Sequence, residues 1–323
     1  QFILEAFAEA GHDVYFVDPS EAKPRQVGSV HIVPTLAGTP SGGVILYAHF
    51  APVRSMFDRY DDSVLVYDIL DDLSIFDEDE KGMPESRRVR SHHPVVMADA
   101  DVVLASAPAL VDRHEVERSD IMYVENGVDP ARFGTPVELL PGDMSFVGPI
   151  VGYHGMISRW FDFDLVREVA DNRPDWSVVL VGPTDPSVQS QVNELDERDN
   201  VHFLGPRASD EIAGYVQTFD VGIVPFVVDD MTIAVSPLKM YEYLAAGVPV
   251  VATPLPVCVS HPLVSTAADA KEFGALIDTA LASTTDRDAR ASRIAAAEDA
   301  SWASRLEPVL ARLDSLGKRR IQR

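Results

Sequence analysis

The fold of this chain is decided by residues 236–252, which read SPLKMYEYLAAGVPVVA. The first part of this stretch consists of good helix formers and begins with Pro237, whose missing N–H is not needed in a first helical turn. Gly247 follows, and glycine readily takes the left-handed conformation that ends many helices. Val248–Ala252 then reads as a buried strand. The stretch therefore predicts a helix followed at once by a strand, which is the repeating unit of a parallel α/β sheet.

The start of the predicted helix has the properties of a phosphate-binding site. Its first backbone N–H groups have no partner within the helix, and the helix dipole places partial positive charge there. Ser236, Pro237 and Leu238 surround this point, and the ammonium group of Lys239 adds a full charge. Glu242 follows one turn later on nearly the same face, where a carboxylate can accept hydrogen bonds from the vicinal hydroxyls of a ribose. The alternative is an ordinary amphipathic helix that covers a sheet.

The composition restricts the partners and location that we expect. The chain has 323 residues, enough for two domains, and a formal net charge of −24, so duplex nucleic acid is not an expected partner. Because no apolar run reaches about 18 residues, we expect a cytoplasmic protein without a spanning helix. Its basic end, residues 318–323, is either a solvated tail or a peripheral contact with anionic lipid. Cys258 is the only cysteine, and His92 and His93 are adjacent rather than spaced as metal ligands, so no metal site is expected.

Short apolar runs alternate with helical patterns along the whole chain. The predicted strands are residues 13–17, 30–33, 44–47, 64–67, 102–104, 121–124, 144–147, 176–181, 220–226 and 248–252. This alternation predicts parallel, doubly wound sheets, in which ligands bind beyond the carboxyl ends of the strands. Prolines and glycines break the pattern at about 130–142, and we expect the linker between the two domains there.

Residues 237–247 carry a resemblance to a known family. The pattern P-x-K-x-x-E-Y-L-A-A-G resembles the nucleotide-sugar helix of retaining GT-B glycosyltransferases of the broad family 4 group. It is most similar to that of bacterial teichuronic-acid-type and other cell-surface polysaccharide transferases. The resemblance implies that Glu242 binds the ribose of the donor and that Lys239 acts at its diphosphate. The family's usual first glutamate is replaced here by Ala234, so its role at the donor sugar is not carried over.

Two stretches of the first domain extend the resemblance. Residues 66–72, VYDILDD, are similar to a Y-D-x-x-D-D segment of the same transferases. By that resemblance Asp71 and Asp72 hold hydroxyls of the acceptor or of the donor sugar, and the alternative is a solvated acidic turn. Residues 123–129, YVENGVD, resemble the string that ends the last strand of the first domain in GT-B enzymes.

Two loops of the second domain resemble donor-binding loops of the family. Residues 152–160, GYHGMISRW, match a G-Y-x-G-x-I-x-x-W loop, which implies that Gly152 approaches the diphosphate and that Arg159 supplies a cation. Arg159 in a surface charge pair is the alternative. The loop at residues 203–207 resembles the one that binds the nucleobase, with Leu204 and Arg207 on either side of the base. A purely structural loop is the alternative there.

The resemblance implies a GT-B protein with two Rossmann-like, doubly wound domains facing an interdomain cleft. We expect an acceptor-side domain at residues 1–135, a nucleotide-sugar domain at 136–300 and a final helix at 301–323 that returns to the first domain. The family's first strand is expected to precede residue 1.

The expected reaction moves a sugar from a UDP- or GDP-type donor to a hydroxyl acceptor, such as a lipid-linked or growing glycan. It is expected to retain configuration and to need no metal or other cofactor. A GT-B nucleotide-sugar epimerase and a catalytically silent sugar-nucleotide-binding subunit are the alternatives.

Overall fold

The computed structural model describes residues 2–37, 39–49, 51, 60, 62–72, 84–138 and 140–321. It divides into two compact units, one formed by Gln1–Asn126 with Trp302–Arg323 and the other by Gly127–Ser301. The sequence analysis placed the boundary after residue 135, and the structure places it earlier. The short helix α4 (Pro130–Gly134) belongs to the second unit because it packs on α8 (Leu238–Ala245).

The first unit contains two sheets. Its four-stranded sheet is parallel and has the order β4-β5-β6-β7, with strands Ile45–Ala48, Val64–Ile69, Val102–Ala105 and Met122–Tyr123. A smaller sheet joins β1 (Val14–Val17) in parallel to β3 (Val30–Val33), and β3 pairs antiparallel with β2 (Arg25–Val27). Gly28, with a φ of 55°, makes the turn between β2 and β3. The sequence analysis missed β2, whose residues Arg25 and Gln26 do not form an apolar run.

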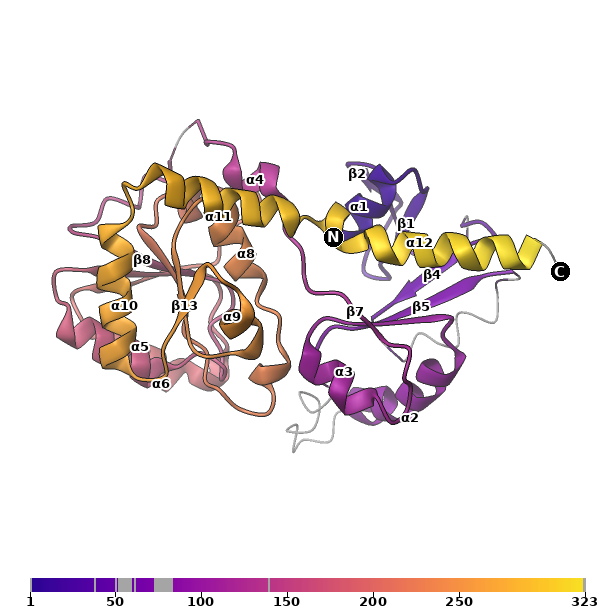
Figure 1. The fold of residues 1–323 in the computed structure, drawn as a ribbon, viewed down its shortest axis with the longest axis horizontal. Helices are drawn as coiled ribbons and strands as arrows, with labels where there is room; N and C mark the ends of the chain where they lie inside the picture. The colour runs from indigo at the N-terminus through magenta and orange to yellow at the C-terminus, as the bar shows by residue number, and fades with distance from the viewer. Residues whose placement is uncertain are drawn as a thin grey trace. The chain divides into compact units, whose positions relative to one another are not determined.

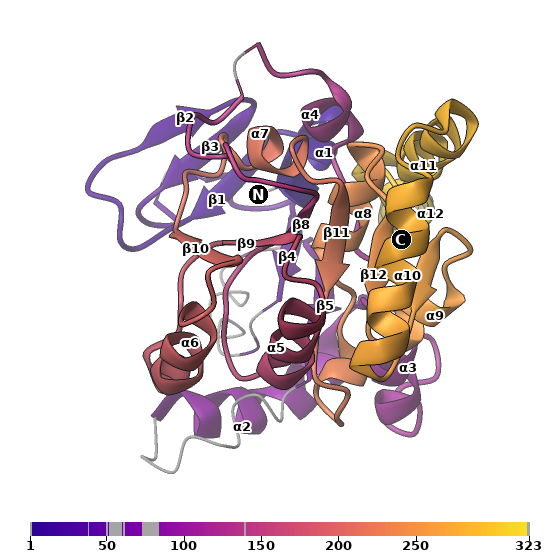
Figure 2. The same ribbon diagram turned by 90° about the vertical axis from the view of Figure 1, so that its left-hand side faces the viewer.

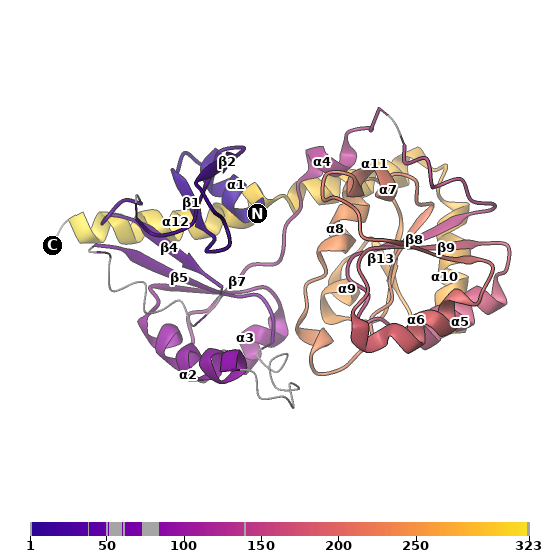
Figure 3. The same ribbon diagram turned by 180° about the vertical axis from the view of Figure 1, so that it is seen from behind.

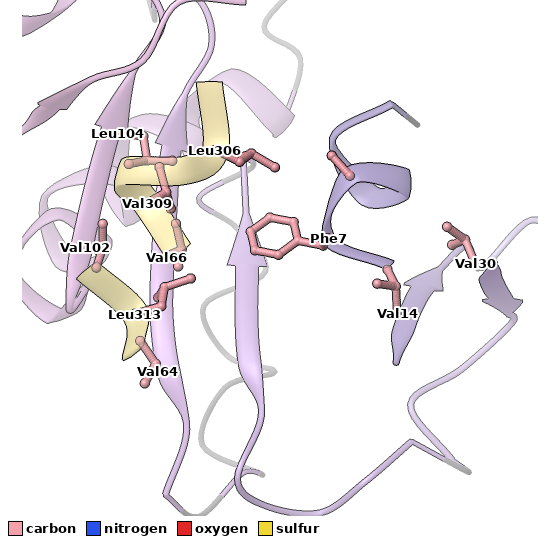
Figure 4. Close-up of a cluster of buried hydrophobic side chains, with 11 residues drawn as sticks. Phe7, Val14, Val30, Val64, Val66, Val102, Leu104, Leu306, Val309 and Leu313 are labelled. Carbon is pink, nitrogen blue, oxygen red and sulfur yellow. The ribbon is translucent and has the colours of Figure 1, made fainter. Parts of the chain in front are cut away.

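Helices cover both faces of the four-stranded sheet. α12 (Trp302–Ile321) lies along one face, while α2 (Pro84–Asp99) and α3 (Pro108–His114) lie on the other (Figures 1 and 3). Alternate residues of β5 and β6 point toward α12, whose contacting residues recur at helical spacing. The buried cluster drawn in Figure 4 contains Val64, Val66, Val102, Leu104, Leu306, Val309 and Leu313, together with Phe7 from α1 (Phe2–Glu9). The last helix of the chain is therefore part of the core of the first unit.

The second unit is built on one six-stranded sheet in which every pair of neighbouring strands is parallel. In the order β10-β9-β8-β11-β12-β13, its strands are Val201–Gly205, Ser177–Val181, Ile150–His154, Val221–Val224, Val250–Ala252 and Val264–Thr266. Numbered along the chain, this is the 3-2-1-4-5-6 order of a Rossmann fold. The order reverses between β8 and β11, and open α/β sheets bind ligands beyond the carboxyl ends of the strands at such a switch point.

The helices of the second unit form two layers. α8 and α10 (Ala270–Ala282) cover opposite faces of the sheet (Figures 1 and 3), and α5 (Phe163–Asn172) packs against both α10 and α6 (Gln189–Asp196) (Figure 2). The remaining helices are α7 (Ile212–Val216), α9 (Pro256–Ser260) and α11 (Arg287–Asp299), with short 3₁₀ turns at Pro186–Val188 and Thr232–Ala234. Within the described residues, none of the helices combines the length and the apolar character that crossing a membrane requires.

The first strand of the second unit differs from the prediction. Residues 144–147 are not a strand, and Val147 is 89% exposed. The strand is β8, whose residues from Gly152 onward the sequence analysis assigned to a donor-binding loop. Gly152 lies inside this strand. Glycine is required at this position because a Cβ would meet the Phe219 ring at 2.2 Å. The glycine thus makes room for an aromatic ring, and its position in a strand argues against the predicted contact with a diphosphate.

Candidate functional site

The candidate site is built around the first turns of α8. Pro237 is the N-cap, with a φ of −71° and a ψ of 110°, and it provides no side-chain hydrogen bond to the helix. The proline therefore lies one position before the place that the sequence predicted. Met240 N–H donates to Pro237 O, so the uncapped N–H groups are those of Leu238 and Lys239 at the very start. Gly247, with a φ of 74°, ends the helix as predicted.

Lys239 is half-buried at the switch point of the sheet. Its Nζ atom lies 4.5 Å from the centre of the Phe226 ring, which follows β11, and 5.0 Å from the centre of the Tyr153 ring in β8. Burial lowers the pKa of Lys239 to about 8, although the negative charge of Glu242 acts in the opposite direction. Aromatic faces attract an ammonium group but offer it no hydrogen-bond acceptor as strong as an anion. The site is therefore suited to receive a negatively charged ligand beside Lys239.

Two glycines let the backbone come close to Lys239. A Cβ at Gly155, which has a φ of 123°, would lie 3.2 Å from Lys239 Cε. At Gly182, with a φ of 149°, a Cβ would lie 2.0 Å from Gly155 O, so the chain segments that follow β8 and β9 are in direct contact. A larger residue at Gly155 would crowd Lys239, and one at Gly182 would force apart the segments that follow β8 and β9.

Glu242 lies beside a histidine that the sequence analysis did not single out. His154 Nε2 is 2.9 Å from Glu242 Oε2, and both side chains are largely buried, at 10% and 12% exposure. The two atoms are close without being aligned as a hydrogen bond. The backbone N–H of His154 donates to the Tyr243 hydroxyl, and the His154 and Tyr243 rings meet edge to face. His154 is the last residue of β8. Ligands bind at the carboxyl ends of the strands in such sheets, so its position at a strand end could have identified it from the sequence.

A family comparison covers most of this unit, and a second comparison finds a curated relative of the chain. Residues 146–283 match the family described as Glycosyl transferases group 1. The second unit is a group 1 glycosyltransferase domain. A Bacillus subtilis (strain 168) protein, described as "Putative teichuronic acid biosynthesis glycosyltransferase TuaH", is 33% identical over 184 residues, which are 54% of this chain and 46% of that protein. The chain thus spans less than half the length of this curated relative.

Solved structures extend the likeness to both units. Sucrose-phosphate synthase from Thermosynechococcus elongatus has a TM-score of 0.72 at 17% identity, and the match covers 97% of this chain and 91% of the synthase chain. HepE from Anabaena, in complex with UDP-glucose, has a TM-score of 0.62 at 20% identity, and the match covers 84% of this chain and 78% of the HepE chain. At these identities the comparison shows the fold alone. The chain has the GT-B fold, which confirms the fold class that the sequence predicted.

The other residues predicted around the donor of the group 1 domain lie in different settings. Ser236 is buried immediately before α8, whereas Leu238 is 39% exposed on its first turn. Arg159 is exposed, and its Nη2 atom lies 3.3 Å from Met231 Sδ in the loop that leads to α8. Arg159 therefore contacts the segment that precedes α8, and its predicted role as a cation at the diphosphate stays a prediction.

Arg207 is held by the protein itself. Its guanidinium donates to the Asp143 carboxylate, to the Tyr215 hydroxyl and to Leu204 O, at 2.6, 2.6 and 2.5 Å. Leu204 lies in β10 and is half-buried. These contacts favour the alternative in which residues 203–207 form a structural loop, because the donors of Arg207 are already occupied.

The acidic residues predicted in the first unit differ from one another. Asp72 is buried and forms an ion pair with Arg113, whereas Asp71 is exposed. The sequence analysis did not single out Asp68, which is 6% exposed in β5 and accepts a hydrogen bond of 2.6 Å from the Tyr47 hydroxyl. Burial raises the pKa of Asp68 to about 6. Of the two predicted residues, only Asp71 is exposed, although partial desolvation raises the pKa of its carboxyl group.

Proposed function

We propose that the chain is a glycosyltransferase that moves a sugar from a nucleoside-diphosphate-sugar donor to a hydroxyl acceptor with retention of configuration. The observation that carries the proposal is the placement of Lys239 and Glu242 on α8, at the switch point of the group 1 domain. The ammonium group suits a diphosphate, and the carboxylate suits the hydroxyls of a ribose. Because Lys239 precedes Glu242 along one face of α8, the diphosphate would lie toward the helix start and the ribose about one turn later.

The chemical step that we propose requires a good leaving group. The bond between the anomeric carbon and the diphosphate oxygen breaks, and the acceptor oxygen bonds to that carbon on the face that the diphosphate leaves. The acceptor proton passes to the departing phosphate oxygen, so no protein nucleophile is needed. Lys239 and the N–H groups of Leu238 and Lys239 stabilise the charge that develops on the diphosphate. This stabilisation is the main contribution of the protein to the rate in our proposal.

The relatives support a choice of donor and acceptor to test first. HepE has been solved with UDP-glucose, so a UDP-sugar is the first donor to test and a GDP-sugar the second. TuaH is described by its role in teichuronic acid biosynthesis, which favours a polysaccharide or its lipid-linked precursor as the acceptor. On the acceptor side we propose Asp71 as a hydroxyl ligand, while Asp72 positions the loop through Arg113.

The first experiment measures the thermal stability of the protein with UDP, GDP, ADP, dTDP and their common sugar conjugates. A nucleotide that binds only the folded protein raises its melting temperature. We expect one nucleotide family to do so selectively. If none of them raises the melting temperature at millimolar concentration, the proposed donor site is wrong.

Glu242→Gln tests the ribose contact directly. We compare the affinities of UDP and 2′,3′-dideoxy-UDP, or of the corresponding pair of the selected nucleotide. The wild-type protein should prefer the ribose form by about tenfold or more, since hydrogen bonds to a charged group contribute about 1.5–3 kcal/mol. The variant keeps an amide oxygen as an acceptor but loses the charge, so its preference should shrink to that of a neutral hydrogen bond, about 0.5–1.5 kcal/mol. Glu272→Gln, on the exposed first turn of α10, is the matched control and should keep the preference.

The products distinguish the proposed transferase from its two rivals. An epimerase converts the donor sugar without an acceptor, and a silent subunit binds the donor without turnover. Transfer that depends on a hydroxyl acceptor, followed by mass spectrometry of the glycan, supports the proposal. Epimer formation, or binding without turnover across an acceptor screen, supports the respective rival.

A further inference from the structure

Three potential metal ligands meet in the first unit, whereas the residues proposed for the donor belong to the second unit. They are His93 on α2, His114 at the end of α3 and Glu117 in the turn that follows. One ligand atom from each lies within 4.8 Å of the other two. The sequence analysis expected no metal site because it considered the spacing of neighbouring residues, whereas these side chains are brought together by the packing of α2 beside α3.

The two distances from Glu117 to the histidines are close to those of a tetrahedral cation site. Glu117 Oε2 lies 3.4 Å from His114 Nδ1 and 3.7 Å from His93 Nε2. Zinc binds histidine nitrogen at about 2.0–2.1 Å and carboxylate oxygen at about 2.0–2.2 Å, so adjacent ligand atoms of a tetrahedral site are roughly 3.4 Å apart. Small side-chain movements would therefore complete the coordination.

His93 has a nitrogen that the protein leaves unsatisfied. The side chain is buried, with 4% of the residue exposed, and its Nε2 atom has no hydrogen-bond partner. On the opposite side of the ring, Nδ1 lies 2.8 Å from the hydroxyl of Tyr67 in β5. A metal-binding histidine commonly has its second nitrogen fixed in this way by a hydrogen-bonding neighbour. The Tyr67 contact holds Nε2 toward Glu117 and His114.

The cationic side chains next to the cluster have other partners. Arg113 pairs with Asp72, and Arg118 pairs with Asp120. Arg118 also donates to Met97 O and Ala100 O, which ties the turn after α3 to the end of α2. The Glu117 carboxylate is about half exposed, at 51%, and its ion-pair contacts are with His93 and His114. Glu117 is thus available to a cation, and solvent can reach the cluster from its side.

We propose that His93 Nε2, His114 Nδ1 and Glu117 bind one divalent transition-metal cation of the zinc type, with water as the fourth ligand. The cation would join α2 to the turn after α3 on the face of the sheet opposite α12. Two imidazole nitrogens and one carboxylate favour zinc over magnesium or calcium, which prefer oxygen ligands. This site is independent of the proposed donor chemistry, because its ligands belong to the first unit.

The test uses the full chain without a histidine tag, treated with EDTA and freed of the chelator. Calorimetric titration with Zn²⁺ should give one site per chain, and Co²⁺ should give the visible absorption of a four-coordinate ion. His114→Gln and Glu117→Gln change side chains at the partly exposed side of the site, so both proteins should fold. Each should lower Zn²⁺ affinity at least tenfold.

Matched controls are available beside each ligand. His92→Gln changes the neighbouring histidine on α2, and Glu115→Gln changes an exposed glutamate two residues before Glu117. Both controls should keep the wild-type affinity within about twofold. Lys239→Ala should also keep it, which separates this result from any failure of the proposed donor site. A stoichiometry well below one, or equal Zn²⁺ binding by wild type, His114→Gln and Glu117→Gln, would overturn the proposal.

Discussion

Two basic residues of the group 1 domain, Lys239 and Arg207, were both predicted to bind the donor, and the structure places them in opposite situations. Lys239 lies against the rings of Phe226 and Tyr153, and burial lowers its pKa. Arg207 is fully engaged by Asp143, Tyr215 and Leu204 O, and its contacts with Asp143 and Tyr215 raise its pKa. A cation that the protein already neutralises stabilises the fold, whereas one that is buried among aromatic rings is suited to a ligand.

The largest effect is expected from Lys239→Ala. Loss of one group that stabilises charge in a transition state typically lowers turnover about 100- to 1000-fold, and we expect a loss of this size. The measurement is the rate of sugar transfer at saturating donor. Lys271→Ala, which removes an exposed lysine from α10, is the control and should leave the rate unchanged. Near-normal turnover by Lys239→Ala would remove the distinction between the two basic residues.

The pH dependence of nucleotide binding should show the same distinction. Because the pKa of Lys239 is about 8 in the free protein, its ammonium group loses its proton as the pH rises through that value. The charge is then absent from the diphosphate site, so affinity should fall about tenfold between pH 7 and pH 9. Lys239→Arg keeps its charge over this range and should bind with a nearly constant affinity. An equally steep fall in the arginine variant would assign the pH dependence to another group.

The smallest effect on binding is expected from Arg207→Ala. The variant loses hydrogen bonds that join residues 203–207 to Asp143 and Tyr215, and we expect the free energy of unfolding to fall by about 1–2 kcal/mol. Nucleotide affinity should stay within about twofold of the wild-type value. Chemical denaturation and calorimetry measure the two quantities. Weaker binding without a loss of stability would restore Arg207 to the base-binding role that the sequence suggested.

The features that could be predicted from sequence depend on short-range signals. The helix and strand in residues 236–252 were predicted because Pro237, Gly247 and the apolar run after them act locally. The pairing of Lys239 with Glu242 on one face of α8 follows from helical spacing alone. The parallel sheets followed from the alternation of apolar runs and helical patterns, and the GT-B fold followed from the family resemblance.

The features that were missed depend on contacts between distant segments. β8 was not predicted because Gly152 was interpreted as a loop residue. The glycine instead makes room for the ring of Phe219, a contact between segments that are far apart in the sequence. His154 beside Glu242, and the cluster around His93, exist only after separate elements have packed together. Asp72 was predicted as a sugar ligand because a sequence does not show that Arg113 will pair with it.

The place of α12 has a consequence for synthesis of the protein on the ribosome. Leu306, Val309 and Leu313 belong to the core of the first unit, but they are translated after the whole of the second unit. The nascent first unit therefore has Val66 and Leu104 uncovered while residues 127–301 emerge and fold. Such exposed apolar surface is a binding target for chaperones and a source of aggregation. Completion of the first unit must wait until the last helix has left the exit tunnel.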